Sequence, residues 1–139
     1  MNQAALTTAQ EIGQAAIALE QLRTGHRPRS VAVVVNADTL VITLHGALSP
    51  AERALAQSPA GAAQVQEFHR QLFSNASEAL QQEIKRITGV EVREAAVEIE
   101  PTTGTLLQVF TTGTMVQVFL LAGDVPADSW SGSGPDEAS

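Results

Sequence analysis

The chain has no cysteine and no tyrosine, and its aromatic residues are four phenylalanines and one tryptophan among 139 residues. Without cysteine it forms no disulfide, no thiolate nucleophile and no cysteine-ligated zinc or iron–sulfur centre. Its longest apolar stretches, Val31–Val35 and Met115–Ala122 (the second interrupted by Gln117), are far shorter than the ~20 residues that span a bilayer. Eight bases stand against fifteen acids. Nucleic acid is therefore not an expected partner, because phosphates need clustered Lys and Arg.

The composition predicts a folded protein of ordinary hydrophobicity, 44% hydrophobic and 17% charged, with a net charge of −7. Residues 1–8 carry neither the basic residue nor the apolar run of a signal peptide, so we expect a cytoplasmic chain with no transmembrane segment. Residues 122–139 hold four acids, no base, and many Ser, Gly and Pro. We expect a single domain over 1–121 and a flexible acidic tail over 122–139 that contains Trp130.

Apolar residues at spacings of three and four predict three helices. The first covers about 8–22 with the stripe Ile12, Ala15, Ala16, Leu19 and Leu22, and it ends at Gly25. The polar residues Glu11, Gln14, Glu20, Gln21 and Arg23 are expected around that stripe. The second begins at the capping box Ser49–Glu52, in which Glu52 reaches back to the amide of Ser49. The third begins at Ser58-Pro59, covers 59–88 as one helix of about 45 Å and ends at Gly89. Its apolar stripe consists of Val65, Phe68, Leu72, Ala76, Leu80, Ile84 and Ile87.

Runs of β-branched residues predict strands on both sides of these helices. Residues 30–36 and 39–45 form a hairpin around Asn36-Ala37-Asp38, and further strands are expected over 90–100, 105–111 and 115–121. The order α-β-β-α-α-β-β(-β) predicts an α+β fold in two layers, a mainly antiparallel sheet with helices on one face.

No phosphate-binding loop, dinucleotide fingerprint or nucleophile elbow is present, so the sequence favours a protein without enzymatic activity and predicts no cofactor. An alternative is a small metal-assisted enzyme that uses His45, Glu52 and His69 as ligands. Against it, Glu52 is explained by its capping box, and His69, at the edge of the helical stripe, is expected to be partly exposed or interfacial.

One basic cluster stands out, and it consists of Arg23, His26, Arg27 and Arg29. It is either a solvated loop that complements the dipole of the first helix or a docking site for an anion or an acidic partner.

Self-association is also expected, as a homodimer or a larger assembly. A helix of 30 residues would overhang a domain whose radius of gyration is roughly 14 Å. The apolar residues predicted at the resulting interface are Phe68, Leu72, Met115, Val118 and Phe119.

With these elements in order, the chain resembles the MpsC-like family of small prokaryotic proteins. The resemblance covers about 9–111, with Glu98 where the family has Asp, and the chain adds the strand 115–121. It is carried by Gly25-His26-Arg27-Pro28 with Val31, Leu44-His45-Gly46, Gly46–Glu52 with Leu55, Gly61, Val65, Arg70, Leu72, Ile87–Val90 and Thr103-Gly104.

The resemblance implies association with a Na⁺-translocating, membrane-potential-generating system linked to inorganic-carbon uptake. We therefore expect a non-enzymatic cytoplasmic accessory or regulatory protein, peripheral to the membrane through a transporter component. The alternatives are an enzyme of bicarbonate chemistry and an anion or small-ligand sensor at the Arg23–Arg29 loop.

Overall fold

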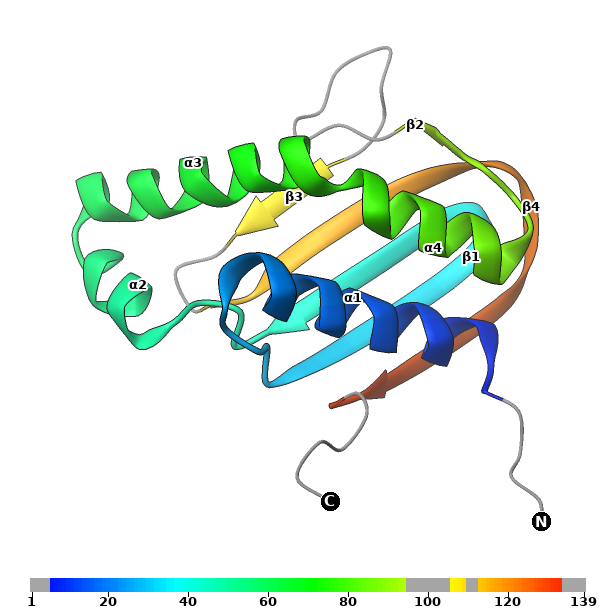
Figure 1. Ribbon diagram of the computed structural model, residues 1–139, viewed down its shortest axis with the longest axis horizontal. Helices are drawn as coiled ribbons and strands as arrows, with labels where there is room; N and C mark the ends of the chain where they lie inside the picture. The colour runs from blue at the N-terminus through cyan, green and yellow to red at the C-terminus, as the bar shows by residue number, and fades with distance from the viewer. Residues whose placement is uncertain (1–5, 95–105, 110–112, 134–139) are drawn as a thin grey trace.

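The computed structural model describes residues 6–94, 106–109 and 113–133. It has the predicted α+β fold with an antiparallel sheet, and Figure 1 shows the helices α1, α3 and α4 on the same side of that sheet. Of the strands predicted over 90–100 and 105–111, only short pieces lie among the described residues. The elements in chain order are α1 (Thr8–Thr24), β1 (Ser30–His45), α2 (Pro50–Leu55), α3 (Pro59–Ala76), α4 (Glu78–Thr88), β2 (Val92–Glu94), β3 (Leu106–Val109) and β4 (Met115–Gly132).

Strand β1 folds back on itself, as the predicted hairpin requires. The amide of Arg29 donates to the carbonyl of His45 at 2.8 Å, so the two ends of the strand lie side by side. Sixteen residues in one straight strand would hold those ends about 50 Å apart. The turn lies at Ala37, which has a left-handed φ of 56°, and the sheet register shifts on both sides of it.

The expectation of a flexible tail is wrong for the residues up to Gly132, because they form the second half of β4. Residues 115–120 pair with 39–44, and residues 128–132 pair with 31–35. Figure 1 shows β4 turning at one end of the sheet and running back along the other side of β1. β4 also pairs with β2 and β3, so every other strand is bonded to it. Pairing partners about 100 residues apart explain why local composition does not reveal this strand.

Two side chains of this segment bind α1. Asp128 Oδ2 accepts from the amide of Ala9 at 2.8 Å, in the first turn of the helix, where backbone N–H groups lack partners. That bond lowers the pKa of Asp128. The ring of Trp130 lies against Gly13, where a Cβ atom would be 2.6 Å from a ring carbon. Both contacts hold the end of β4 onto the first helix.

The long helix predicted over 59–88 is two helices, α3 and α4, with a break at Ser77. Arg23 Nη1 reaches across from α1 and donates to the carbonyl of Ala76 at 3.4 Å, a group that a continuous helix would use internally. Ser77 has a ψ of −12°, away from the helical value. The predicted helix is therefore interrupted at one residue, and Figure 1 shows α3 and α4 following one another along the same side of the sheet.

The buried faces of α1 and α3 are turned away from the predicted stripes. In α1, Leu22 is 80% exposed, whereas Glu20, expected on the polar side, is 2% exposed. In α3, Phe68 is 52% exposed and His69 is 2% exposed, so His69 is a buried residue rather than a partly exposed one. Polar contacts between the helices, described below, explain both differences.

The fluorescence of Trp130, the only tryptophan, tests whether residues 122–132 belong to the fold. We expect its emission to change in the same urea transition as the circular dichroism of the helices, because its ring packs on α1. Trp130→Ala should lower the free energy of unfolding by about 2 kcal/mol, while Ser131→Ala at an exposed position changes it by less than about 0.5 kcal/mol. Emission that stays constant through the helical transition would contradict this placement.

Candidate functional site

A hollow of about 490 Å³ opens where α1 ends and β1 begins. Gly25 ends α1 with a left-handed φ of 79°, and the hydroxyl of Thr24 accepts from the amide of His26, which shapes the loop. The second wall is the end of the hairpin, and the third is α2. The lining residues are His26, Arg27, Arg29, Gly46, Leu48, Pro50, Arg53, Ala54 and Gln57.

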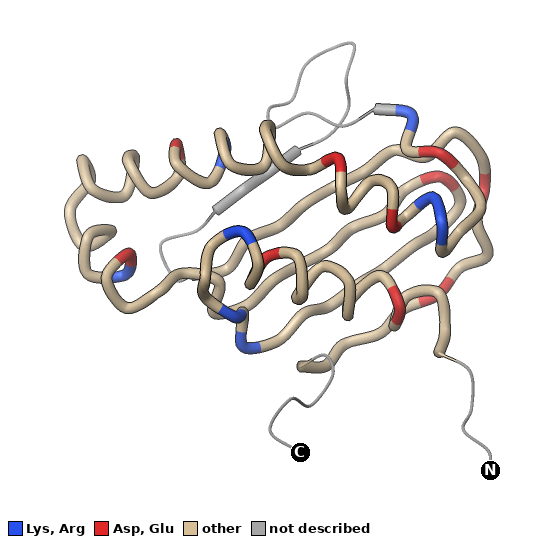
Figure 2. Tube along the Cα trace, viewed as in Figure 1, with Lys and Arg blue, Asp and Glu red and all other residues tan. Residues whose placement is uncertain are grey.

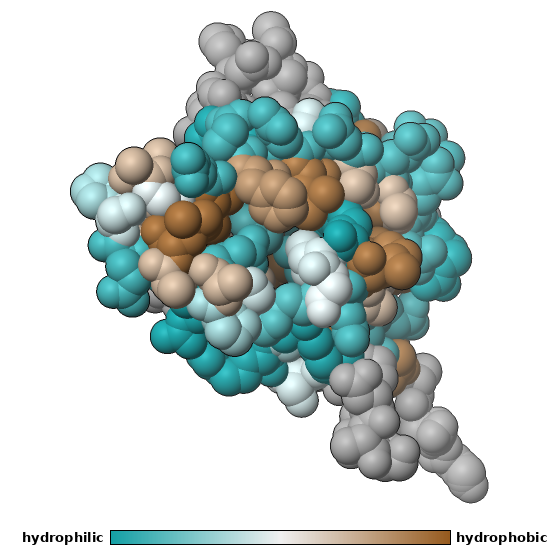
Figure 3. Space-filling view, turned by 60° about the vertical axis from the view of Figure 1, so that its left-hand side comes forward, coloured by the Kyte–Doolittle hydropathy of each residue, from teal (hydrophilic) through white to brown (hydrophobic). Residues whose placement is uncertain are grey.

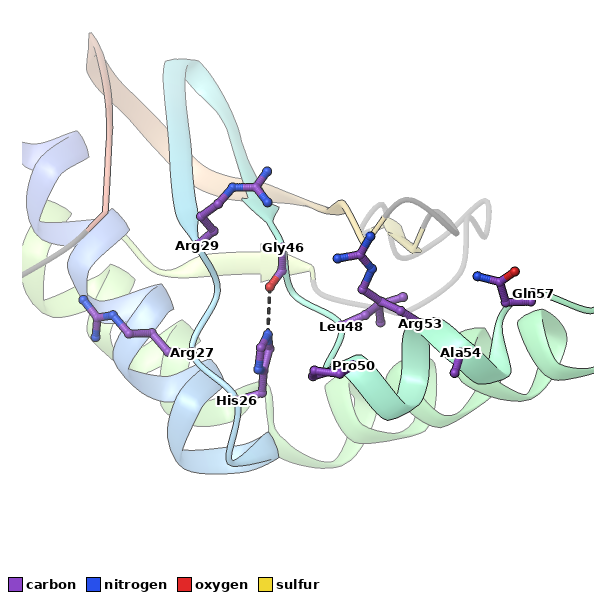
Figure 4. Close-up of a pocket in the computed structure, with 9 residues that line it drawn as sticks. All are labelled: His26, Arg27, Arg29, Gly46, Leu48, Pro50, Arg53, Ala54 and Gln57. Carbon is purple, nitrogen blue, oxygen red and sulfur yellow. Dashed lines mark hydrogen bonds between the residues drawn. The ribbon is translucent and has the colours of Figure 1, made fainter.

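Arg29 and Arg53 form the charged part of this hollow. Figure 4 shows their side chains directed into it from opposite walls, while the Arg27 side chain points away. Both are exposed, and within the part of the chain that the structure describes neither guanidinium has an ion pair or a hydrogen bond. Arg27 is bound elsewhere, and its Nη2 donates to the carbonyl of Ser133 at 2.8 Å. The hollow thus holds two guanidinium groups that have no anionic partner among those residues.

Gly46 allows the two walls to approach. Its φ is 63°, and a Cβ atom there would lie 2.9 Å from the Cβ of Arg29. The carbonyl of Gly46 accepts from Nε2–H of His26 at 3.0 Å, which fixes that ring across the floor of the hollow. The next residue, Ala47, is buried and donates its amide to the carbonyl of Gly113 at 2.7 Å. Backbone contacts therefore set the shape of the hollow.

The net charge of −7 is not spread evenly over the molecule. Figure 2 shows basic segments gathered where α1 ends and β1 begins, whereas acidic and basic segments alternate along α4 and at the far ends of the strands. Among the described residues that line the hollow there is no Asp or Glu. Such a concentration of guanidinium groups is typical of sites that bind carboxylate, carbonate, sulfate or phosphate.

Arg23, the fourth residue of the predicted basic cluster, lies in a different site. Its Nη2 donates to Oε1 of Glu20 at 3.0 Å, and its side chain is 11% exposed. Glu20, Arg23 and His69 form a buried polar cluster with Gln117 of β4. Glu20 Oε2, Arg23 Nε and Gln117 Oε1 are buried in this cluster and have no hydrogen-bond partner in the part of the chain that the structure describes.

His69 joins the cluster to α2. Its Nε2–H donates to Oε2 of Glu52 at 2.8 Å, and its Nδ1 lies 4.0 Å from Oε2 of Glu20. The capping box is present as predicted, because the amide of Ser49 donates to Glu52 Oε1 at 2.9 Å and the amide of Glu52 donates to Ser49 Oγ at 3.2 Å. Glu52 thus uses one carboxylate oxygen to cap α2 and the other to bind α3.

The structure brings two of the three candidate metal ligands together. Glu52 and His69 are bonded, but His45 is not part of their contacts. In residues 6–94, 106–109 and 113–133 there is no group of three or more His, Asp or Glu side chains arranged to hold a metal ion.

The residues predicted for an oligomer interface do not share one surface. Met115 and Phe119 are core residues, 2% and 0% exposed, and Phe119 packs on Phe73 with ring centroids 5.9 Å apart. Phe68 is half exposed on α3, and Leu72 and Val118 are of intermediate exposure. On the face shown in Figure 3, apolar side chains lie in separate groups among polar ones. Homodimer formation stays a prediction that light scattering tests.

Sequence reasoning missed Arg53 and Glu20. Arg53 lies 24 residues from Arg29 and has no neighbouring base, so only the fold shows that the two share a hollow. Apolar spacing alone places Glu20 on the solvent side of its helix. The signal that could have revealed Glu20 is Arg23, three residues later, since pairs at this spacing meet on one helix face.

Glu20 and Glu52 should each make the free energy of unfolding depend on pH, and the two dependences should have opposite signs. Burial raises the pKa of Glu20 above 4.5 and outweighs the nearby Arg23 and His69. Burial would also raise the pKa of Glu52, but the amide of Ser49 and His69 outweigh it and lower that pKa below 4.5. The wild type should therefore lose stability relative to Glu20→Gln as the pH rises above 4.5.

The Glu52→Gln variant should show the opposite pH dependence. The stability of this variant relative to the wild type should fall as the pH rises toward 4.5, because the folded wild type favours the ionised carboxylate of Glu52. Urea denaturation between pH 3.5 and 7.5 measures both differences. A wild-type advantage over Glu20→Gln that grows above pH 4.5 would contradict the assignment of Glu20.

Comparison with protein families places these observations in context. The family model described as "Na⁺-translocating membrane potential-generating system (MpsC)" matches residues 5–114. No curated protein and no solved structure matches the chain. Among the helices that the structure describes, each is too short or too polar to span a bilayer. The three walls of the basic hollow all lie within the matched residues, which cover more than half of the sequence, and the chain therefore belongs to the MpsC family.

Proposed function

We propose that this chain is a non-enzymatic accessory component of an MpsC-type membrane system and that it binds a small oxyanion in the basic hollow. The observation that carries the proposal is the pair Arg29 and Arg53, which point into one hollow whose described lining residues include no acid. The family description supports the link to a Na⁺-translocating system.

The chemistry of the guanidinium group favours an oxyanion as the ligand. Its N–H donors lie in one plane and match the oxygens of a carboxylate, carbonate or phosphate group. Two like charges directed into one hollow repel each other, so a bound anion stabilises the pair as well as itself. A volume of about 490 Å³ is within the range of small-ligand pockets.

Bicarbonate is the first ligand to test. It is a small planar oxyanion that fits the donor plane of a single guanidinium. The resemblance of the chain to a family linked to inorganic-carbon uptake gives a second reason. If it binds bicarbonate, the protein would sense this ion on behalf of a transporter component, and that component is the partner we propose.

Removal of both guanidinium groups should abolish binding while the fold is retained. For Arg29→Ala/Arg53→Ala we expect an affinity for bicarbonate or sulfate lower by about tenfold or more, because hydrogen bonds to charged groups contribute about 1.5–3 kcal/mol each. Isothermal titration calorimetry at low ionic strength measures this.

The matched control is Arg86→Ala/Arg93→Ala, which removes the same charge from exposed positions on α4 and β2. It should weaken binding by less than about twofold, since exposed charges away from a site act only through a screened field. If the Arg29/Arg53 and Arg86/Arg93 double variants lose the same anion affinity, the hollow is not the binding site. Absence of binding of bicarbonate, sulfate and phosphate to the wild type would refute the proposed function.

A further inference from the structure

Helix α2 depends on few contacts for its position. It has six residues, and none of them is buried. Its capping box at Ser49 fixes where it begins, the bond from His69 to Glu52 and the close approach of its end to α3 join it to that helix, and Ala56 at its end packs against the core. At that end a Cβ atom on Gly61 would lie 1.8 Å from the carbonyl oxygen of Leu55, so only glycine fits. A helix without buried side chains gains little from the hydrophobic effect, and these polar and steric contacts decide where it lies.

His69 is a rigid support for one of these contacts. Its side chain is 1% exposed and lies in the middle of α3. The charged groups that face it are Glu20 and Arg23 from α1 and Glu52 from α2, while the described side chains of β4 nearby, Met115 and Gln117, do not titrate. Because the ring is enclosed on the side of α1, its Nε2–H has one fixed direction, toward α2.

The two faces of α2 have different roles. One face lines the hollow, and its residues follow one another at spacings of three, one and three: Pro50, Arg53, Ala54 and Gln57. Glu52, next to Arg53 in the chain, points to α3 and accepts the bond from His69. A rotation or shift of α2 that breaks this bond would move Arg53 at the same time.

We propose that His69 and Glu52 are positioning residues for the anion site, because their hydrogen bond holds α2 so that Arg53 faces Arg29. This inference rests on the proposed function of the hollow and adds how the hollow is assembled. It couples the buried cluster of α1 and α3 to the charge that a ligand meets.

The direction in which removal of Glu52 changes the anion affinity separates a positioning role from simple electrostatics. Glu52 is an anion beside the hollow, so its removal should strengthen anion binding if only Coulomb repulsion changes. If Glu52 positions Arg53, its removal should weaken binding. With sulfate as the probe at pH 7, we expect Glu52→Ala to weaken binding by about fivefold.

A charge-matched control and a conservative variant complete this comparison. Glu67→Ala removes an exposed acid of α3 that pairs with Arg70, and it should leave the sulfate affinity unchanged or slightly higher. Glu52→Gln should stay within about twofold of the wild type, because its amide can bond to Ser49 and to the other tautomer of His69. Unchanged or tighter binding by a folded Glu52→Ala variant overturns the inference.

A double-mutant cycle tests whether Glu52 acts through Arg53. In the Arg53→Ala background, Glu52→Ala should cause no further loss of sulfate affinity, because the group it positions is gone. Losses that multiply would show a general structural effect of Glu52 and would overturn the inference. The proposed function survives that outcome, since it depends on the effect of Arg29→Ala/Arg53→Ala.

Amide hydrogen exchange of the free protein tests the positioning without a ligand. His69→Leu keeps the capping box but removes the bond to Glu52. The amides of Arg53, Ala56 and Gln57, which bond within this segment, should exchange about fivefold faster or more, while those in the middle of α1 are unchanged. If the wild type binds no anion but this change occurs, the proposed function fails alone. If α2 exchanges as in the wild type, the positioning role fails.

Discussion

Pairing of β4 with all the other strands is the constraint on which the rest of the structure depends. Its first half lies between one arm of β1 and the short strands β2 and β3, and its second half continues along the other arm of β1. The hairpin of β1 is therefore enclosed by a single strand, and its two ends meet where Arg29 bonds to His45. That junction is the floor of the basic hollow, so the sheet determines where the loop after α1 lies. β4 begins after the residues that match the family model.

Local signals predict those element ends whose signal is complete within a few residues. The capping box of α2, the hairpin turn around Ala37 and the glycines that end α1 and α4 are all present. The faces of the helices were less predictable. Apolar spacing assumes that charged residues avoid the core, but Glu20 is buried because Arg23 and His69 accompany it. The C-terminal strand could not be predicted from composition, because its partners are far away in the sequence.

The candidate site likewise contains residues that the sequence predicts and residues that only the fold reveals. His26, Arg27 and Arg29 are adjacent in the sequence, and their loop was recognised as a basic cluster. The structure keeps His26 and Arg29 at the hollow, turns the guanidinium of Arg27 toward Ser133, and assigns Arg23 to the buried cluster. Arg53 could be found only from the fold, since it joins the site through the placement of α2. Glu52 was correctly explained as a cap, yet its second oxygen carries a contact that a local motif does not include.

Burial of a carboxylate and an imidazole between helices is a costly way to gain stability, because desolvation offsets much of the attraction. Buried polar atoms of Glu20, Arg23 and Gln117 that find no partner among the described residues add to that cost. The cluster instead fixes the orientation of α2. Apolar contacts would hold α2 near α3 at many rotations of similar energy, whereas an N–H donor and a carboxylate oxygen 2.8 Å apart favour one. We interpret the cluster as a specificity device that selects one position of a small exposed helix, and with it one position of the arginine that this helix presents.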